Sequence, residues 1–157
     1  MRTTDFASLL SIYLLSYLPC QRGVSDNTLA SYETAFSRLL LYCEEVCGLP
    51  VRKITIEALS PDLIEGYLNW LCEKQGNSAS TRNQRLSAIK AFFKFVRREN
   101  SRYIYSCERI LQIPMKKCPT PVLQYLSYEE IKEMLEKPEP STEKGFRDLL
   151  ILCLLYD

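Results

Sequence analysis

The side chains best suited to chemistry in this chain are the cations concentrated between residues 78 and 118. This segment holds ten Lys and Arg residues against only Glu99 and Glu108, a net charge of +8 (10 − 2), whereas the whole chain carries +1. The segments before and after it are both net acidic. A positive segment inside a nearly neutral chain predicts a local contact with an anionic partner.

The spacing of the polar residues in this segment predicts that they share one face of a helix. They follow one another at steps of four, three, four and three, opposite an apolar stripe that runs from Leu86 to Val96. This spacing gives a polar, cationic stripe of Asn83, Ser87, Lys90, Lys94 and Arg97.

The beginning of the same helix is also rich in groups that bind phosphate. A helix N-terminus presents free backbone amides and a partial positive charge, which suit an anion. Hydroxyl, amide and guanidinium groups there can contact phosphates and reach base edges in a major groove. The residues concerned are Ser80, Thr81, Arg82 and Arg85. We therefore expect double-stranded DNA as the partner of this helix.

An ordinary solvated face is the alternative explanation of the same pattern. Solvated helix faces usually mix charges of both signs, because pairs at i,i+4 stabilise the helix, yet only Glu99 interrupts the run from 78 to 107. Two further sets of residues are open to both interpretations, as surface residues or as contacts with a phosphate backbone. They are Thr28, Ser31, Thr34 and Arg38 on a second predicted helix, and Lys116 and Lys117 in a linker.

Several classes of catalytic chemistry are excluded within the chain because it contains no His. Ser-His-Asp and Cys-His catalysis both need an imidazole, as does any His-ligated metal site. The seven Cys residues are scattered and form no C-x-x-C pair, which disfavours a zinc site. The five Gly residues never cluster into a phosphate-binding loop. We expect no metal, cofactor or small-molecule ligand, and Cys side chains that act mainly as small buried hydrophobes in a reducing cytoplasm.

The apolar stretch from Phe6 to Leu18 resembles neither an export signal nor a membrane span. It contains three Ser residues and follows Asp5, and no small-x-small cleavage site comes after it. It is also shorter than the roughly 20 apolar residues that a membrane-spanning helix needs. We expect no membrane contact and a cytoplasmic location.

Helical periodicity predicts an all-α fold, with apolar residues recurring at three- and four-residue steps. We expect helices at about 4–18, from a cap at 25–27 to Gly48, from Ser60 to Gly76, from about Ser80, and at about 103–111. These helices form a four- to five-helix bundle over residues 1–112. Proline at 114, 119 and 121 predicts a linker over 113–125. Residues 126–157 contain a capping box at Ser127 and a strongly apolar last helix, which we interpret as the opening of a second, truncated domain.

Several motifs, in their order along the chain, resemble the N-terminal half of the tyrosine recombinases, the phage integrase family. The second helix begins Asn27-Thr28-Leu29-Ala30-Ser31-Tyr32, as the family's core-binding domain does. The fourth reads Arg85-Leu86-Ser87-Ala88-Ile89-Lys90-Ala91-Phe92-Phe93-Lys94-Phe95. A Pro-Lys-Lys-type linker follows, then Leu126-Ser127-Tyr128-Glu129-Glu130-Ile131 and the helix from Arg147 to Asp157.

The resemblance implies a SAM-like core-binding domain that clamps DNA with its second and fourth helices, followed by the first two helices of the catalytic domain. In that family a Tyr nucleophile, assisted by Arg, Lys and His or Trp, cleaves DNA without a cofactor. The segments that carry those residues lie beyond the match to Tyr156-Asp157, so we carry over no catalytic residue and expect this chain to be inactive alone. The resemblance also implies self-association of the full-length protein on DNA, through apolar positions near Tyr13 and Tyr17. A helical protein-interaction module without nucleic-acid binding remains the alternative, and retained cleavage activity is a third hypothesis.

Overall fold

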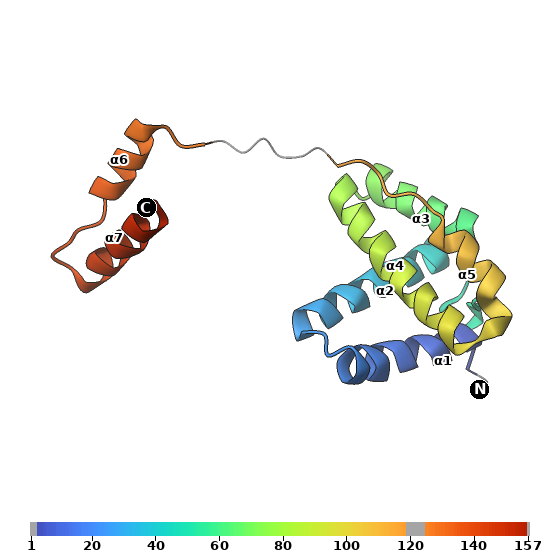
Figure 1. Ribbon diagram of the computed structural model, residues 1–157. Coiled ribbons are helices and arrows are strands. Elements are labelled where there is room, and N and C mark those ends of the chain that lie inside the picture. The colour runs from blue at the N-terminus through green and yellow to red at the C-terminus, as the bar shows by residue number, and fades with distance from the viewer. Residues whose placement is uncertain (1–2, 119–124, 157) are drawn as a thin grey trace. The chain divides into compact units, whose positions relative to one another are not determined.

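The computed structural model describes residues 3–118 and 125–156, and every regular element in these ranges is helical (Figure 1). The chain forms two compact units, Met1–Cys118 and Pro119–Asp157. The predicted all-α class is therefore confirmed for the described residues. The division between the units falls within the predicted linker, 113–125.

The first unit begins with α1 (Asp5–Ile12), which continues as a π-helix over Tyr13–Gln21. The sequence predicted a helix that ends at about residue 18, but the helical structure continues through Pro19, which lies inside the π-helical part. A proline ring clashes with the carbonyl four residues earlier in an α-helix, and the wider π turn relieves this clash. The helix therefore extends to Gln21, just before Gly23, whose φ of 58° suits glycine.

Four more α-helices complete this unit, and a serine cap sets the start of three of them. They are α2 (Asp26–Glu45), α3 (Pro61–Glu73), α4 (Ala79–Glu99) and α5 (Ile104–Leu111), with short 3₁₀ turns at Val51–Lys53 and Ser101–Tyr103. Ser25, Ser60 and Ser78 each accept a hydrogen bond from the backbone amide three residues later. The predicted Ser60 cap is confirmed, whereas α4 starts at Ala79, slightly before the predicted Ser80.

Aromatic rings from α1, its π-helical extension, α2 and α4 fill the core between these helices. The predicted apolar stripe of α4 is fully buried, and Phe92 beside it packs edge-on against Phe6 and Phe36 with ring centroids 5.7 and 5.3 Å apart. Tyr13 also belongs to this cluster and is 1% exposed. Tyr13 itself therefore belongs to the core, whereas Ile12 and Leu15 beside it are exposed, so apolar positions near Tyr13 do lie on the surface.

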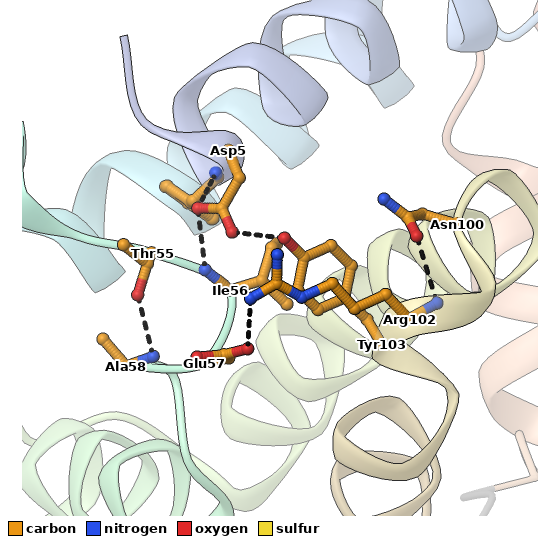
Figure 2. A network of polar contacts seen from close by, with 9 residues as sticks. Asp5, Thr55, Ile56, Glu57, Ala58, Asn100, Arg102 and Tyr103 are labelled. Atoms are coloured by element: carbon orange, nitrogen blue, oxygen red, sulfur yellow. Dashed lines mark hydrogen bonds and ion pairs between the residues drawn. The ribbon is translucent and has the colours of Figure 1, made fainter. Parts of the chain in front are cut away.

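A polar network ties the N-terminus of α1 to two later segments (Figure 2). The Asp5 carboxylate accepts hydrogen bonds from the Tyr103 hydroxyl at 2.6 Å and from the Ile56 backbone amide at 3.2 Å. Beside them Arg102 pairs with Glu57 at 3.2 Å. These contacts join residues about 50 and 100 positions apart, so they fix the start of α1 on the unit.

The cysteines are less buried than the sequence predicted. Only Cys43 and Cys107 are buried, whereas Cys20, Cys47, Cys118 and Cys153 are exposed. The three-four spacing extended the apolar stripe of α2 to Cys47, but the α-helix ends at Glu45 and Cys47 lies in the turn beyond it. The described residues contain no group of His, Cys, Asp and Glu side chains placed to hold a metal ion.

The second unit contains α6 (Tyr128–Glu136) and α7 (Glu143–Tyr156). The predicted capping box is confirmed: the Glu130 amide donates to the Ser127 hydroxyl, and the Ser127 amide donates to the Glu130 carboxylate. Several apolar side chains of α7 remain exposed, including Leu154 and Leu155, each at 79%. Among the described helices of both units, none has the length and apolar character that would cross a membrane.

Candidate nucleic-acid interface

Helices α2 and α4 lie against each other in the first unit (Figure 1), and Ser31 of α2 is the residue at which their polar side chains meet. Gln84 Nε2 hydrogen-bonds the Ser31 hydroxyl at 3.1 Å, and Arg85 Nη1 donates to the Ser31 carbonyl at 3.2 Å. The predicted polar residues of the two helices are thus brought together, although they lie more than 50 positions apart in the sequence.

A hollow of about 360 Å³ at this junction is lined by uncharged hydrogen-bonding groups. Its lining includes Thr28 and Ser31 from α2 and Ser87 from α4, all predicted, together with Asn27 and Gln84, which the sequence analysis missed. Hydroxyl and amide groups of this kind can both donate and accept hydrogen bonds. The hollow can therefore match the donors and acceptors on the edges of bases.

A second hollow, of about 260 Å³, lies on the Arg85 side of α4. Thr34 and Arg38 from α2 line it together with Arg85 and residues that precede α4. Burial raises the pKa of the neighbouring Tyr67 to about 12, and the positive charges of Arg85 and Arg38 act against this rise. Both guanidinium groups therefore contribute to the positive potential in this part of the unit.

A third hollow, of about 420 Å³, lies between the π-helix and the later turns of α4. Three cations line it, namely Arg22, Lys94 and Arg98. The Arg98 guanidinium stacks over the Tyr17 ring at 4.7 Å and also donates to the Tyr17 hydroxyl at 3.4 Å. Because Arg98 pairs with its neighbour Glu99 in an exposed ion pair, Lys94 and Arg22 supply most of the net charge here.

None of the residues that line these three hollows is acidic. Of the lining cations, only Arg98 has an ion-pair partner among the described residues. Around the axis of α4, Gln84 and Ser87 of the uncharged hollow lie between Arg85 on one side and Lys94 on the other, so the three hollows form a surface with cations on both sides of an uncharged centre. This arrangement suits a ligand that carries negative charge along two separate lines.

The side chains of the predicted stripe on α4 differ in how far they remain free of other contacts, and Arg85 lies outside this stripe. Arg85 lies nine residues before Lys94, which places the two about 180° apart around an α-helix. Arg97 forms an ion pair with Glu108 of α5. Loss of solvation lowers the pKa of half-buried Lys90, with further contributions from the positive charges of Lys94 and Arg82. The periodicity predicted correctly which side of α4 each side chain occupies. The neighbouring helices, however, determine which of these side chains are free to contact a ligand.

The predicted site residues at the start of α4 differ from one another in exposure and in hydrogen bonding. Ser80 is exposed, whereas the Thr81 hydroxyl hydrogen-bonds the capping Ser78 hydroxyl at 3.1 Å. Arg82 is only 5% exposed and Asn83 is occupied by the backbone of Lys116. Arg82 is therefore turned into the protein and half-buried Asn83 is engaged by the linker backbone, while Lys116 and Lys117 are exposed beside them.

A model of the phage integrase N-terminal SAM-like domain matches residues 13–100, from the π-helix to the end of α4. The chain belongs to the phage integrase family. All three hollows lie in this match, so the polar surface is part of the integrase SAM-like domain.

The chain is also similar to curated integrases and recombinases over nearly its whole length. It is 34% identical over 149 residues to a Sinorhizobium fredii protein named "Putative integrase/recombinase y4rD", covering 95% of this chain and 53% of that protein. It is 28% identical over 136 residues to the tyrosine recombinase XerD of Vibrio cholerae, covering 87% of this chain and 42% of that protein. The chain thus spans about half the length of these relatives. No solved structure was found to match it.

Proposed function

We propose that this integrase chain binds double-stranded DNA through the surface at the α2–α4 junction, as the DNA-binding part of a site-specific tyrosine recombinase. The observation that carries the proposal is the arrangement of the three hollows, with cations on two sides of an uncharged centre and no acidic residue in their lining. The similarity to proteins named as integrases and tyrosine recombinases supports it independently.

The two cationic sides suit the geometry of a helix that lies in the major groove. A sugar-phosphate strand runs along each side of that groove, so cations on opposite sides of α4 can each approach one strand. Arg85 and Lys94 lie about 180° apart around the axis of α4 and about 14 Å apart along it, from nine residues at 1.5 Å each, so each can approach a different strand. Around the axis, Ser87 and Gln84 lie between Arg85 and Lys94, and they would face the bases.

On this basis we assign roles to Gln84, Arg22 and the predicted site residues other than Lys90, which lines none of the three hollows. The base-facing groups are Thr28, Ser31, Ser87 and Gln84, and the phosphate-facing groups are Arg38, Arg85, Lys94 and Arg22. Ser80, Lys116 and Lys117 lie near the start of α4 and extend the phosphate contacts. Arg82, Asn83, Thr81 and Arg97 are engaged within the protein and act indirectly.

We propose further that residues 126–157 correspond to the beginning of the family's catalytic domain. The relatives align through this region, and the exposed apolar side chains of α7 are those of a helix that packs in a larger core. Strand exchange then requires the rest of such a domain, and the chain alone does not cleave DNA. A duplex carrying a trap for the covalent intermediate should give no protein-DNA adduct, and an adduct would overturn the proposal that the chain alone is inactive.

We also propose that the protein acts on DNA in the cytoplasm and that the full-length recombinase self-associates.

The DNA-binding proposal is tested by the salt dependence of binding to a labelled duplex. The logarithm of the affinity should fall linearly with the logarithm of salt concentration, with a slope of about −0.9 for each phosphate contacted. Lys94→Gln and Arg38→Gln should each weaken binding and reduce the magnitude of the slope by about one contact.

Matched controls distinguish the loss of a contact at the α2–α4 surface from the general loss of one positive charge. Lys53→Gln and Arg109→Gln remove exposed cations that line none of the three hollows. They should leave both affinity and slope unchanged. An absence of DNA binding by the unaltered chain would favour the helical protein-interaction module, and equal effects of all four changes would reject the α2–α4 surface.

A further inference from the structure

The second turn of α4 holds the segment that leaves α5. This segment starts from Ile113, which is 3% exposed and belongs to the core. Arg82 Nη1 then donates to the Pro114 carbonyl at 3.3 Å. Asn83 forms two hydrogen bonds with Lys116: its Nδ2 donates to the Lys116 carbonyl at 2.7 Å, and its Oδ1 accepts from the Lys116 amide at 3.0 Å.

The Asn83 side chain therefore satisfies both backbone groups of one linker residue. A side-chain amide has the same donor and acceptor as a peptide group, so this pairing reproduces the exchange of two hydrogen bonds between neighbouring strands. Arg82 Nη1 also donates to Asn83 Oδ1 at 3.2 Å, which requires the oxygen of the amide at that position. The Arg82 contact thus orients Asn83 for its pairing with Lys116.

The burial of Arg82 distinguishes these contacts from ordinary surface hydrogen bonds. Arg82 is the only buried charged residue among those described, and its Nε has no hydrogen-bond partner there. Burying a guanidinium group is costly unless its other contacts compensate. The side chain is kept in this position by the Pro114 carbonyl and Asn83, so the segment from Ile113 to Lys116 is part of the packing of α4.

We propose that Arg82 and Asn83 form a linker clamp, which fixes residues 114–116 against α4 and determines where the linker leaves the first unit. They are positioning residues that do not contact DNA. The clamp places Lys116 and Lys117 beside α4, and this matters for DNA binding only if the proposed function holds. It thereby connects the placement of α4 on a duplex to the path of the chain toward the second unit.

Limited digestion with trypsin, in the absence of DNA, tests the clamp on the full chain. Trypsin cleaves after Lys116 and Lys117, and a protease needs the local backbone released from its contacts. Where opening is fast relative to cleavage, the cleavage rate follows the population of the open form. Asn83→Ala removes both Lys116 hydrogen bonds and should accelerate cleavage at these two sites by about tenfold or more.

Gln84→Ala is the matched control, because it removes the adjacent side-chain amide, which contacts Ser31 instead of the linker. It should leave cleavage after Lys116 and Lys117 unchanged. Asn83→Asp keeps the acceptor for the Lys116 amide but loses the donor, and should give an intermediate rate. Circular dichroism of each variant verifies that α4 remains folded. Cleavage of Asn83→Ala at the control rate would overturn the clamp.

The outcome is independent of the proposed function, since the digestion contains no DNA. If the chain fails to bind DNA but Asn83→Ala still accelerates cleavage, the clamp stands and the DNA-binding proposal falls. If Asn83 instead contacts a base directly, Asn83→Ala weakens DNA binding while the digestion pattern stays unchanged, and this combination rejects the clamp.

Discussion

The hydrogen bond between Tyr103 and Asp5 provides a quantitative test of what holds α1 on the first unit. The Tyr103 ring is buried and its hydroxyl lies 2.6 Å from Asp5 Oδ2 (Figure 2). Tyr103→Phe removes this hydroxyl and leaves the ring in place. Hydrogen bonds to charged groups contribute about 1.5–3 kcal/mol. Because Asp5 is half-buried and water can partly replace the hydroxyl, we expect a loss of about 1.5 kcal/mol.

Thermal and urea unfolding followed by circular dichroism measure this loss. For a unit of this size, about 1.5 kcal/mol corresponds to a decrease in Tm of roughly 6 °C. Tyr105→Phe is the control, because Tyr105 is 77% exposed and its hydroxyl already faces water. Its effect should stay within about 0.5 kcal/mol. A double-mutant cycle with Asp5→Asn should show that the two changes are not additive.

The dependence on pH adds a second check. The hydrogen bond to Asp5 and, to a lesser degree, burial raise the pKa of Tyr103 above its ordinary value of 10.0. A group whose pKa is raised in the folded state stabilises that state below its unfolded pKa, and this stabilisation is lost as the pH rises further. The advantage of Tyr103 over Phe should therefore be constant below about pH 9 and decline above pH 10. Equal stability of Tyr103→Phe and Tyr105→Phe at pH 7 would refute the reasoning.

Two further predictions concern the core. Phe92→Ala should destabilise the first unit by about 3–5 kcal/mol, because the ring packs among Phe6, Phe36 and their neighbours. Urea unfolding measures this loss, and an effect below about 1 kcal/mol would contradict the prediction. Burial raises the pKa of the Cys43 and Cys107 thiols to about 11, so iodoacetamide at pH 8 should alkylate the exposed cysteines first. Mass spectrometry follows the modification of each cysteine. Equally fast modification of Cys43 or Cys107 in the folded chain would contradict their burial.

Local sequence signals predicted most of the helices because those signals act over one or two turns. Ser60 with Pro61, and Ser127 with Glu130, are capping patterns whose hydrogen bonds close within a few residues, and both occur as predicted. The apolar stripe of α4 was predictable for the same reason. The π-helix through Pro19 was not predicted, because a proline in the sequence usually marks the end of an α-helix.

Composition and short-range spacing were enough to predict the helical class, the concentration of positive charge between 78 and 118 and the resemblance to the integrases. Which side chains remain free to contact a ligand depends instead on how the helices pack against one another. Packing buried Arg82, joined Asn83 to Lys116, and brought Ser31 against Gln84. It also placed Arg22 beside Lys94 in one hollow. These relations join residues 33 to 72 positions apart, and periodicity along one helix carries no information about which helix lies next to it.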